Sequence, residues 1–248
     1  MLPLSNLQRA AKEALAYVSA QPDVAEVEVF VSADTNLTCR LNYTSHIPSN
    51  GVEEPKSTDS YGLGLRVAFR SPSAAGAAGS EGEAKTGFGS EPTDLSLDGV
   101  RRSLDKAREG AVADKEFVSL PRGGPSTEVP GRRERASAAD PAIMRIGSGR
   151  LVDSGWRMMD RALDAFNSSE ELASLAGSPD RLPSLGLILG GDLVLLQSRM
   201  AIASTHMPRV QTEQNTLIMS FATAMVESQD AKGSGWSVSN SLAEFNGQ

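Results

Sequence analysis

Residues 25–44, AEVEVFVSADTNLTCRLNYT, carry the alternation that decides how this chain folds. Apolar side chains recur at every second position in each half of the segment, which is typical of a strand with one buried and one polar face. They are Val27, Val29 and Val31 in the first half and Leu37, Cys39, Leu41 and Tyr43 in the second. Asp34, Thr35 and Asn36 stand between the halves and favour a turn. The pattern therefore predicts two strands joined by a hairpin at residues 34–36.

The flanking residues predict two helices and further strands. Before the segment, apolar residues at helical spacing predict a helix that ends before Pro22: Leu4, Leu7, Ala11, Ala14, Leu15 and Val18. After it, YGLGLRVAFRS (61–71) alternates, and KTGFGSE (85–91) is a shorter candidate strand. A second helix follows Ser96, its expected N-cap, with Asp98 in the first turn. Consecutive strands with short connections predict an antiparallel or mixed sheet backed by these helices.

The second half of the chain predicts a long helix followed by a β-meander. From Arg150 one helical face collects Val152, Trp156, Met159, Leu163 and Phe166. Three strand-like runs follow, and Gly190-Gly191-Asp192 predicts a hairpin between the first two. Residues 217–226 are apolar on both faces, so we expect a central strand covered on both sides. AKGSGWS (231–237) is expected to form a turn.

A segment dense in proline, glycine and arginine divides the chain. It predicts an α+β protein with an N-terminal domain at 1–118, an exposed linker at 119–138 and a second α+β domain at 139–248. Residues 72–84, rich in Ala, Gly and Ser, are expected to form a flexible loop. Within the linker, Arg132, Arg133 and Arg135 are interpreted as solvated side chains rather than a binding patch.

The composition excludes several classes of protein. The net charge of −7, from 24 Lys and Arg against 31 Asp and Glu, argues against a nucleic-acid partner. The chain has no uninterrupted apolar run long enough for a membrane helix, and its N-terminus lacks the pattern of a signal peptide. The single cysteine, Cys39, cannot form an internal disulfide and fits a reducing compartment. We therefore expect a cytoplasmic protein with no membrane association.

The residues that could bind a metal are few and scattered. The two histidines, His46 and His206, lie far apart in the sequence, and neither is followed by a Glu or by a second His at ligand spacing. Both are interpreted as surface or strand-end side chains. Cys39 is expected to be a buried, inert thiol because it falls on the apolar face of its strand. The sequence accordingly assigns no catalytic, metal-binding or cofactor-binding residue.

Other catalytic patterns are also missing. Gly147-Ser148-Gly149 and Gly233-Ser234-Gly235 do not match the G-x-S-x-G pattern of a nucleophile elbow. Glu53-Glu54 and Glu170-Glu171 are neighbours in the chain, an arrangement that does not create the facing carboxylates of an acid/base pair. They are interpreted as solvated side chains.

An ordered series of short motifs resembles the TldD/PmbA family. The series begins with G-x-G-x-R-V at residues 62–67 and G-x-G at residues 87–89. It continues with Asp140-Pro141, the long helix, and D-A-K-G-S-G-W at residues 230–236. Together these motifs are similar to the N-terminal and middle domains of that family, and the order of the motifs carries more weight than any one of them.

The resemblance implies a function that this sequence does not carry alone. Family members are cytoplasmic zinc metallopeptidases that cleave unfolded peptides in proteolysis and peptide maturation. They act as homodimers, or as heterodimers of a TldD-like and a TldE/PmbA-like subunit. Their zinc is bound by H-E-x-x-x-H in the C-terminal catalytic domain of the TldD-like subunit. The PmbA/TldE-like partner lacks this motif. This sequence lacks it too, and the C-terminal catalytic domain is expected to be absent from this chain.

Two functions from different classes follow. The chain is either the non-catalytic N-terminal portion of such a metallopeptidase, or a stand-alone binding or scaffold subunit like the PmbA/TldE partner. On the first reading it contributes to dimer assembly and to the chamber that holds the unfolded peptide. The sequence around residues 230–236 favours a PmbA-like parent. A coding frame that continues beyond Gln248 into H-E-x-x-x-H distinguishes the first function from the second.

Overall fold

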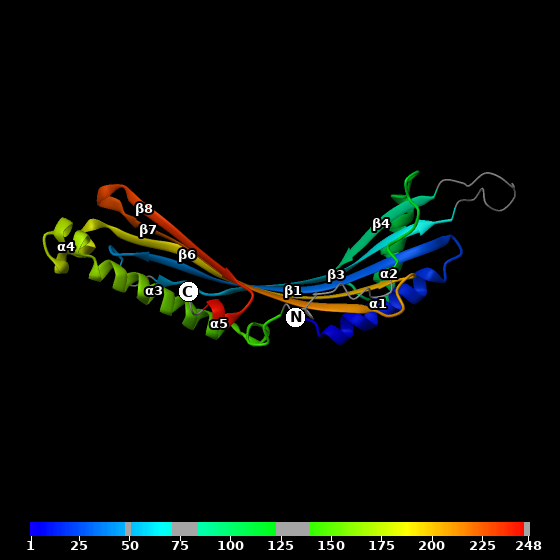
Figure 1. Ribbon diagram of the computed structural model, residues 1–248, viewed down its shortest axis with the longest axis horizontal. Helices are drawn as coiled ribbons and strands as arrows, with labels where there is room; N and C mark the ends of the chain where they lie inside the picture. The colour runs from blue at the N-terminus through cyan, green and yellow to red at the C-terminus, as the bar shows by residue number, and fades with distance from the viewer. Residues whose placement is uncertain (48–50, 71–83, 123–138, 246–248) are drawn as a thin grey trace, which may run out of the picture. The chain divides into compact units, whose positions relative to one another are not determined.

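The computed structural model describes residues 1–47, 51–70, 84–122 and 139–245, and within them the chain has the α+β fold that the sequence predicts. Eight strands form an open antiparallel sheet in the order β5-β4-β3-β1-β6-β7-β8, with β2 paired to β1 (Figure 1). The strands are β1 (Val24–Thr44), β2 (Gly51–Val52), β3 (Lys56–Phe69), β4 (Lys85–Pro92), β5 (Val112–Ala113), β6 (Leu187–Ser204), β7 (Gln211–Val226) and β8 (Ala231–Ser239).

The helices differ widely in length. The α-helices are α1 (Leu4–Ser19), α2 (Leu97–Glu109), α3 (Ser148–Ser168), α4 (Glu170–Ala176) and α5 (Leu242–Phe245). Short 3-10 turns are η2 (Ile143–Arg145), η3 (Pro179–Leu185) and η4 (Glu227–Gln229). Ser96 caps α2 as expected, because its hydroxyl accepts a hydrogen bond from the N–H of Gly99 at 3.4 Å.

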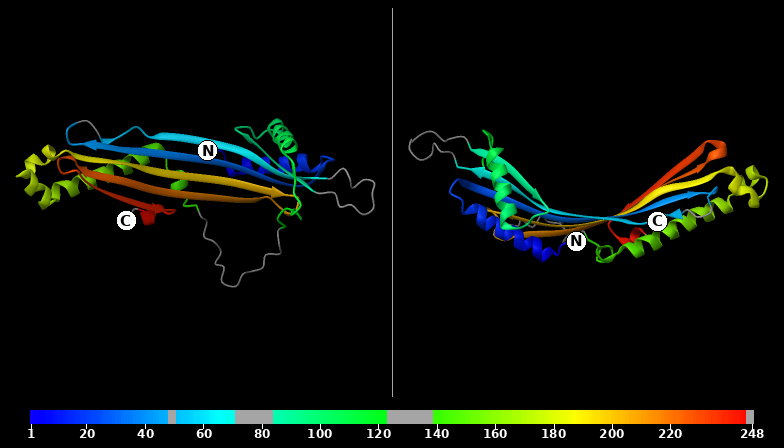
Figure 2. Two further views of the ribbon diagram at one scale, coloured as in Figure 1. Left: turned by 90° about the horizontal axis from the view of Figure 1, so that it is seen from above. Right: turned by 180° about the vertical axis from the view of Figure 1, so that it is seen from behind.

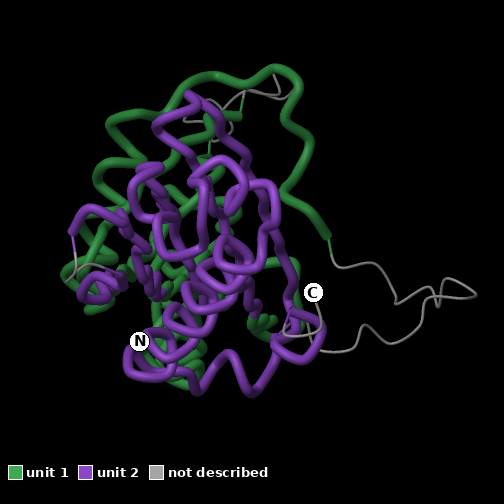
Figure 3. Tube along the Cα trace, turned by 90° about the vertical axis from the view of Figure 1, so that its left-hand side faces the viewer, with its two compact units in different colours: residues 1–34, 59–136, 198–214 green, residues 35–58, 137–197, 215–248 purple. Residues whose placement is uncertain are grey.

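Two compact units divide the chain, and each draws on both halves of the sequence (Figure 3). Unit 1 comprises residues 1–34, 59–136 and 198–214, and unit 2 comprises 35–58, 137–197 and 215–248. β1, β3, β6 and β7 each contribute residues to both units. Of the expected linker at 119–138 only residues 119–122 are described. The expected loop at 72–84 is described only at Ala84, and Arg132, Arg133 and Arg135 lie outside the described residues.

The hairpin expected at residues 34–36 does not exist, because β1 continues through them as one strand. Every odd-numbered residue from Val27 to Leu41 is buried, including Thr35 with 7 % of its surface exposed. The alternating apolar residues of both halves have odd numbers, so one continuous strand places them all on one face. In unit 1 this face packs against α1 and α2 in a single core.

In unit 1, α2 packs closely on the backbone of β4. A Cβ added at Gly89 would lie 1.8 Å from the carbonyl oxygen of Ser103, and one at Gly87 would lie 2.0 Å from that of Ala107. Only glycine leaves room for a helix backbone at this distance. The two glycines also lie opposite Leu65 and Val67 of β3, so the strand register places these large side chains in the core beside the helix.

The α3 helix lies along one face of the strands of unit 2, and β8 forms the edge of the sheet (Figure 2). The buried residues of α3 are Leu151, Gly155, Met159 and Phe166. Met159 and Phe166 of the expected apolar stripe are therefore buried, but its first half is displaced by one residue, from Val152 and Trp156 to Leu151 and Gly155. Trp156 is 44 % exposed because it lies across β2, where its ring comes within 2.6 Å of a Cβ added at Gly51.

The hairpin expected at Gly190-Gly191-Asp192 is also wrong, because β6 runs unbroken from Leu187 to Ser204. The tight two-residue turn needs residues with positive φ, and neither glycine adopts it. Gly191 serves another purpose: a Cβ there would lie 2.1 Å from the carbonyl oxygen of Phe221 in β7. The glycine allows two neighbouring strands to approach closely.

The turn expected at residues 231–237 is instead strand β8, paired antiparallel with β7. The chain reverses just before it, in η4, where Asp230 has a φ of 47°. The expectation that β7 is covered on both sides fails for the described residues, since Met219 is 39 % and Phe221 50 % exposed.

We predict that Gly89→Ala lowers the free energy of unfolding by about 1–3 kcal/mol or more, because the added methyl group displaces the α2 backbone. Gly235→Ala is a matched control: it changes the same kind of strand glycine, and no atom lies within 4 Å of the added Cβ. Urea denaturation of both variants measures the difference. Equal stability of the two variants would contradict the packing of α2 described above.

Candidate functional site

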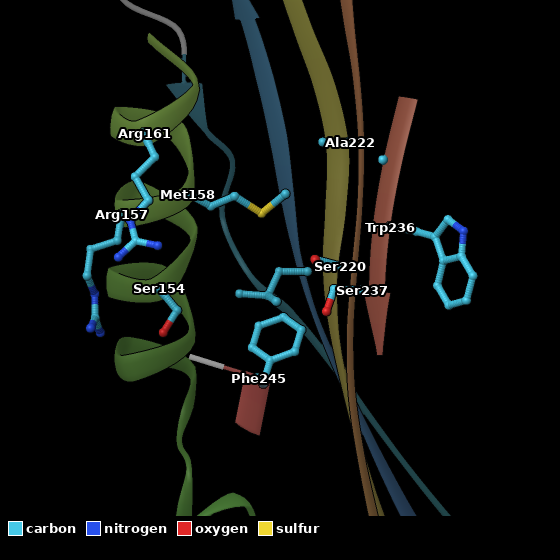
Figure 4. A pocket seen from close by; sticks show the side chains of 11 residues that line it. Ser154, Arg157, Met158, Arg161, Ser220, Ala222, Trp236, Ser237 and Phe245 are labelled. Atoms are coloured by element: carbon cyan, nitrogen blue, oxygen red, sulfur yellow. The ribbon is translucent and has the colours of Figure 1, made fainter. Parts of the chain in front are cut away.

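A groove of about 590 Å³ in unit 2 is the candidate binding site (Figure 4). It lies between α3 and the face of β7 and β8 on the same side of the sheet. Its volume falls within the range of about 300–1,000 Å³ that ligand sites occupy. The residues that line it are Ser154, Arg157, Met158, Arg161, Leu193, Ser220, Ala222, Gly235, Trp236, Ser237 and Phe245.

Small side chains on neighbouring strands create the groove. Across β7 and β8, Ala224 lies opposite Gly233, Ala222 opposite Gly235, and Ser220 opposite Ser237. None of these residues extends far from the sheet, so the backbone beside α3 is left bare. Cβ atoms added at Gly233 and Gly235 would meet nothing within 4 Å.

The helix side of the groove is both apolar and cationic. Ser154, Arg157, Met158 and Arg161 follow the spacing i, i+3, i+4, i+7 and therefore share one stripe of α3. Met158 points from the helix toward the strands, whereas the two arginines extend along the helix at the rim (Figure 4). Among the described residues, neither guanidinium forms an ion pair. Arg157 donates only from its Nε, to the backbone oxygen of Asp153 at 3.3 Å.

The opposite face of the same two strands carries large apolar side chains. Met219 lies opposite Val238, and Phe221 lies opposite Trp236. Trp236 is 76 % exposed and points away from the groove, so it borders the groove only through its backbone (Figure 4). We call these four residues the apolar ladder. Adjacent exposed apolar side chains of this size are typical of an interaction surface.

Cys39 lies under α3 and is buried, as the sequence predicts. A Cβ added at Gly155 would come within 2.7 Å of its Sγ, so the helix packs directly on the thiol. Burial raises the pKa of Cys39, and the nearby carboxylate of Asp192 raises it further. Both effects disfavour the thiolate, which is the form that acts as nucleophile or metal ligand.

The two histidines lie in different units and belong to no common site. His46 is exposed, with its Nε2 at 3.6 Å from Glu227 Oε2. His206 follows β6, and its Nε2 lies 2.9 Å from Glu26 Oε1, both side chains being mostly buried. His206 lies at a strand end, as the sequence predicts, but the sequence gives no sign of its contact with Glu26, because the two residues are 180 positions apart.

Glu26 links three parts of unit 1. Besides the contact with His206, its carboxylate accepts a hydrogen bond from the backbone N–H of Leu120 at 2.6 Å. Burial raises the pKa of Glu26, but the Leu120 N–H, His206 and the charge of Arg122 together outweigh it, so the pKa is lowered overall. The carboxylate therefore holds residues near Leu120, itself buried, against β1.

We predict that Glu26→Gln lowers stability at pH 7 by about 1.5–3 kcal/mol, the usual contribution of hydrogen bonds to a charged group. Because the folded-state pKa of Glu26 is lowered, its contribution is present above the ordinary carboxyl value of 4.5 and is lost as pH falls through the folded-state pKa. The difference between wild type and variant should therefore shrink in acid. Urea titrations from pH 7 to pH 3 measure it.

The control for this experiment is Glu28→Gln, which alters the next carboxylate on the same face of β1. Its effect should be small and should not follow the pH profile of Glu26→Gln. A Glu26→Gln variant with unchanged stability across this range would show that the carboxylate is not a structural link.

The remaining residues singled out in the sequence have structural positions. Gly147-Ser148-Gly149 begins α3, and Gly233-Ser234-Gly235 lies in β8. Glu170 and Glu171 occupy the first turn of α4, where negative charge favours the helix terminus. Glu53 accepts a hydrogen bond from Asn42 at 3.1 Å. The structure brings none of these groups together.

Within the described part of the chain, no cluster of three or more His, Cys, Asp or Glu side chains could hold a metal ion. The same residues include no helix that is both long and apolar enough to cross a membrane. Comparison with protein-family models and with curated proteins found no match to this chain. The choice of the groove and the apolar ladder as candidate sites therefore rests on their geometry alone.

The groove was missed in the sequence although two signals point to it. Arg157 and Arg161 share a helical stripe with Met158, and residues 220–224 and 233–237 alternate small with larger side chains. The second signal has a meaning only if residues 231–237 form a strand, because alternate side chains of a strand point to opposite faces of the sheet. The turn expected at these residues has no such faces.

Proposed function

We propose that this chain is the non-catalytic N-terminal portion of a TldD/PmbA-type metallopeptidase that acts in proteolysis and peptide maturation. In this role it contributes to dimer assembly, as homodimer or TldD/TldE-like heterodimer, and to the chamber that receives an unfolded peptide. A cytoplasmic location is part of the proposal. The family's zinc chemistry belongs to H-E-x-x-x-H, a motif that the sequence lacks, so no catalytic step is assigned to these residues.

The observation that carries the proposal is the pairing of its two glycine motifs. The G-x-G-x-R-V element lies in β3 and the G-x-G element in β4, and the strands pair in register from Gly62 with Pro92 to Phe69 with Lys85. The glycines of the second motif are also the ones on which α2 rests. Motifs chosen from their order in the sequence thus form one structural element, which supports treating them as a single signature.

The role in assembly is supported by the apolar ladder. Its members are exposed by 39 % (Met219), 50 % (Phe221), 76 % (Trp236) and 40 % (Val238). Burial of such side chains contributes roughly 25 cal/mol for each Å² removed from water. A partner surface on this face would therefore gain affinity without any polar contact.

We predict that the purified chain self-associates through the ladder, and that Phe221→Ser with Trp236→Ser weakens association at least tenfold. The measurement is light scattering across a range of protein concentrations. Val118→Ser is the control, because Val118 is 93 % exposed but stands alone in unit 1. A chain that remains monomeric at high concentration contradicts this prediction.

The metallopeptidase proposal is tested by metal content and hydrolysis. We expect the 248-residue chain to bind no stoichiometric zinc and to cleave no unfolded peptide, because zinc hydrolases need three protein ligands that usually include His or Cys. We expect it to associate with a TldD-like subunit that carries H-E-x-x-x-H, and the complex to cleave the peptide. The control is the same subunit with its motif Glu replaced by Gln.

Two outcomes would contradict the proposal. One is a tightly bound zinc ion on the isolated chain together with cleavage that a chelator abolishes. The other is failure to associate with any TldD-like subunit. The second outcome, combined with self-association, favours the stand-alone scaffold instead.

A further inference from the structure

Unit 1 shows how this chain covers a strand of the pattern G-x-G. Gly87 and Gly89 of β4 leave their backbone bare, and α2 rests on it. The residues of α2 that meet these two glycines, Ser103 and Ala107, are small, buried and four positions apart. Val100 and Leu104, three positions before each of them, are large and enter the core. The helix that packs on this strand thus combines a row of small residues with an adjacent row of large apolar ones.

Unit 2 presents the same kind of strand without a helix on it. Gly235 of β8 lines the groove and Gly233 lies on the same face of the strand, and no described atom lies within 4 Å of a Cβ added at either. The neighbouring β7 positions on this face, Ala222 and Ala224, are equally small. Met158 lies beside this bare backbone, where a large side chain of a second helix would find an apolar contact. Leu193 lies beneath the groove and is already buried in the core of unit 2.

In unit 1 the helix supplies the cations and the surface under it supplies the carboxylates. Arg102 and Lys106 of α2 pair with Glu91 of β4, and Arg108 pairs with Asp23. At the groove, Arg157 and Arg161 form no ion pair among the residues that the structure describes. At the groove the cations belong to this chain, so a helix that binds there must supply the carboxylates.

We propose that the groove beside α3 is the docking site for an amphipathic helix of a partner protein. This helix carries a small residue at every fourth position, a large apolar residue after each, and Asp or Glu on the flank that meets Arg157 and Arg161. The inference rests on unit 2 alone and goes beyond the proposed function. An extended peptide at the edge of β8 is disfavoured, because it would lengthen the sheet sideways and leave the face at Ala222 and Gly235 uncovered.

A labelled synthetic peptide tests the proposal directly. The probe is an 18-residue helical peptide with Ala at every fourth position, Leu after each Ala, and Glu on one flank, and its binding to the full chain is followed by fluorescence anisotropy. We expect saturable binding. A second peptide with the Ala positions changed to Leu keeps charge and helicity but cannot approach the backbone, and should bind at least tenfold more weakly.

Variants of the chain locate the site. Gly235→Leu places a large side chain in the groove, where the added Cβ meets nothing within 4 Å, and should weaken probe binding at least tenfold. Ser234→Leu is the matched control, because it adds the same side chain one residue away on the opposite face, where Ser234 lies beside Thr223. It should leave binding unchanged.

The charged rim is tested by Arg157→Gln with Arg161→Gln, which should weaken binding about threefold to tenfold, as expected for two exposed ion pairs. Arg150→Gln on the same helix should have no effect, because Arg150 does not line the groove. Unchanged binding to Gly235→Leu would overturn the proposal. So would preferential binding of an extended Val/Glu peptide, or loss of self-association in Gly235→Leu, which would make a second copy the occupant.

Discussion

Burial of one side of β1 is the constraint on which the rest of the structure depends. Val27, Val31 and Thr35 lie on the same side as Leu37 and Leu41, and all of them are buried. One strand thus supplies apolar surface to the cores of both units, and each unit covers it with its own helices. Because side chains alternate along a strand, a single inserted residue would turn every apolar side chain after it to the wrong face. This requirement explains why turn-forming residues at 34–36 do not interrupt the strand.

The sequence predicted the elements better than the connections between them. The α+β class, α1, the strands around Leu65 and the Ser96 cap follow from local periodicity and capping, which depend on neighbours in the chain. The false hairpins at 34–36 and at Gly190-Gly191 came from composition alone. Glycine at position 191 reflects a close approach to Phe221, a tertiary contact that no local pattern reveals. The alternation keeps to odd-numbered residues from Val27 to Leu41, and this was the local signal against a turn at residues 34–36.

The candidate groove was beyond prediction for a related reason. Its floor combines residues from β6, β7 and β8 with a stripe of α3, and its shape depends on which strand face carries the small residues. Once β8 is known to be a strand, the same residues divide into a bare face and the apolar ladder. The division gives β7 and β8 two distinct surfaces, one suited to a closely packed backbone and the other to large side chains.

The positions of the two tryptophans have a spectroscopic consequence. Trp156 and Trp236 are the only tryptophans in the sequence, and both belong to unit 2, one lying across Gly51 and the other on the ladder. Indole emission excited at the red edge of the absorption band therefore reports on unit 2 alone. Circular dichroism in the amide region averages over the whole chain. Coincident transitions in the two signals would mean that the strands shared by the units melt as one, and separate transitions would give the stability of unit 2 by itself.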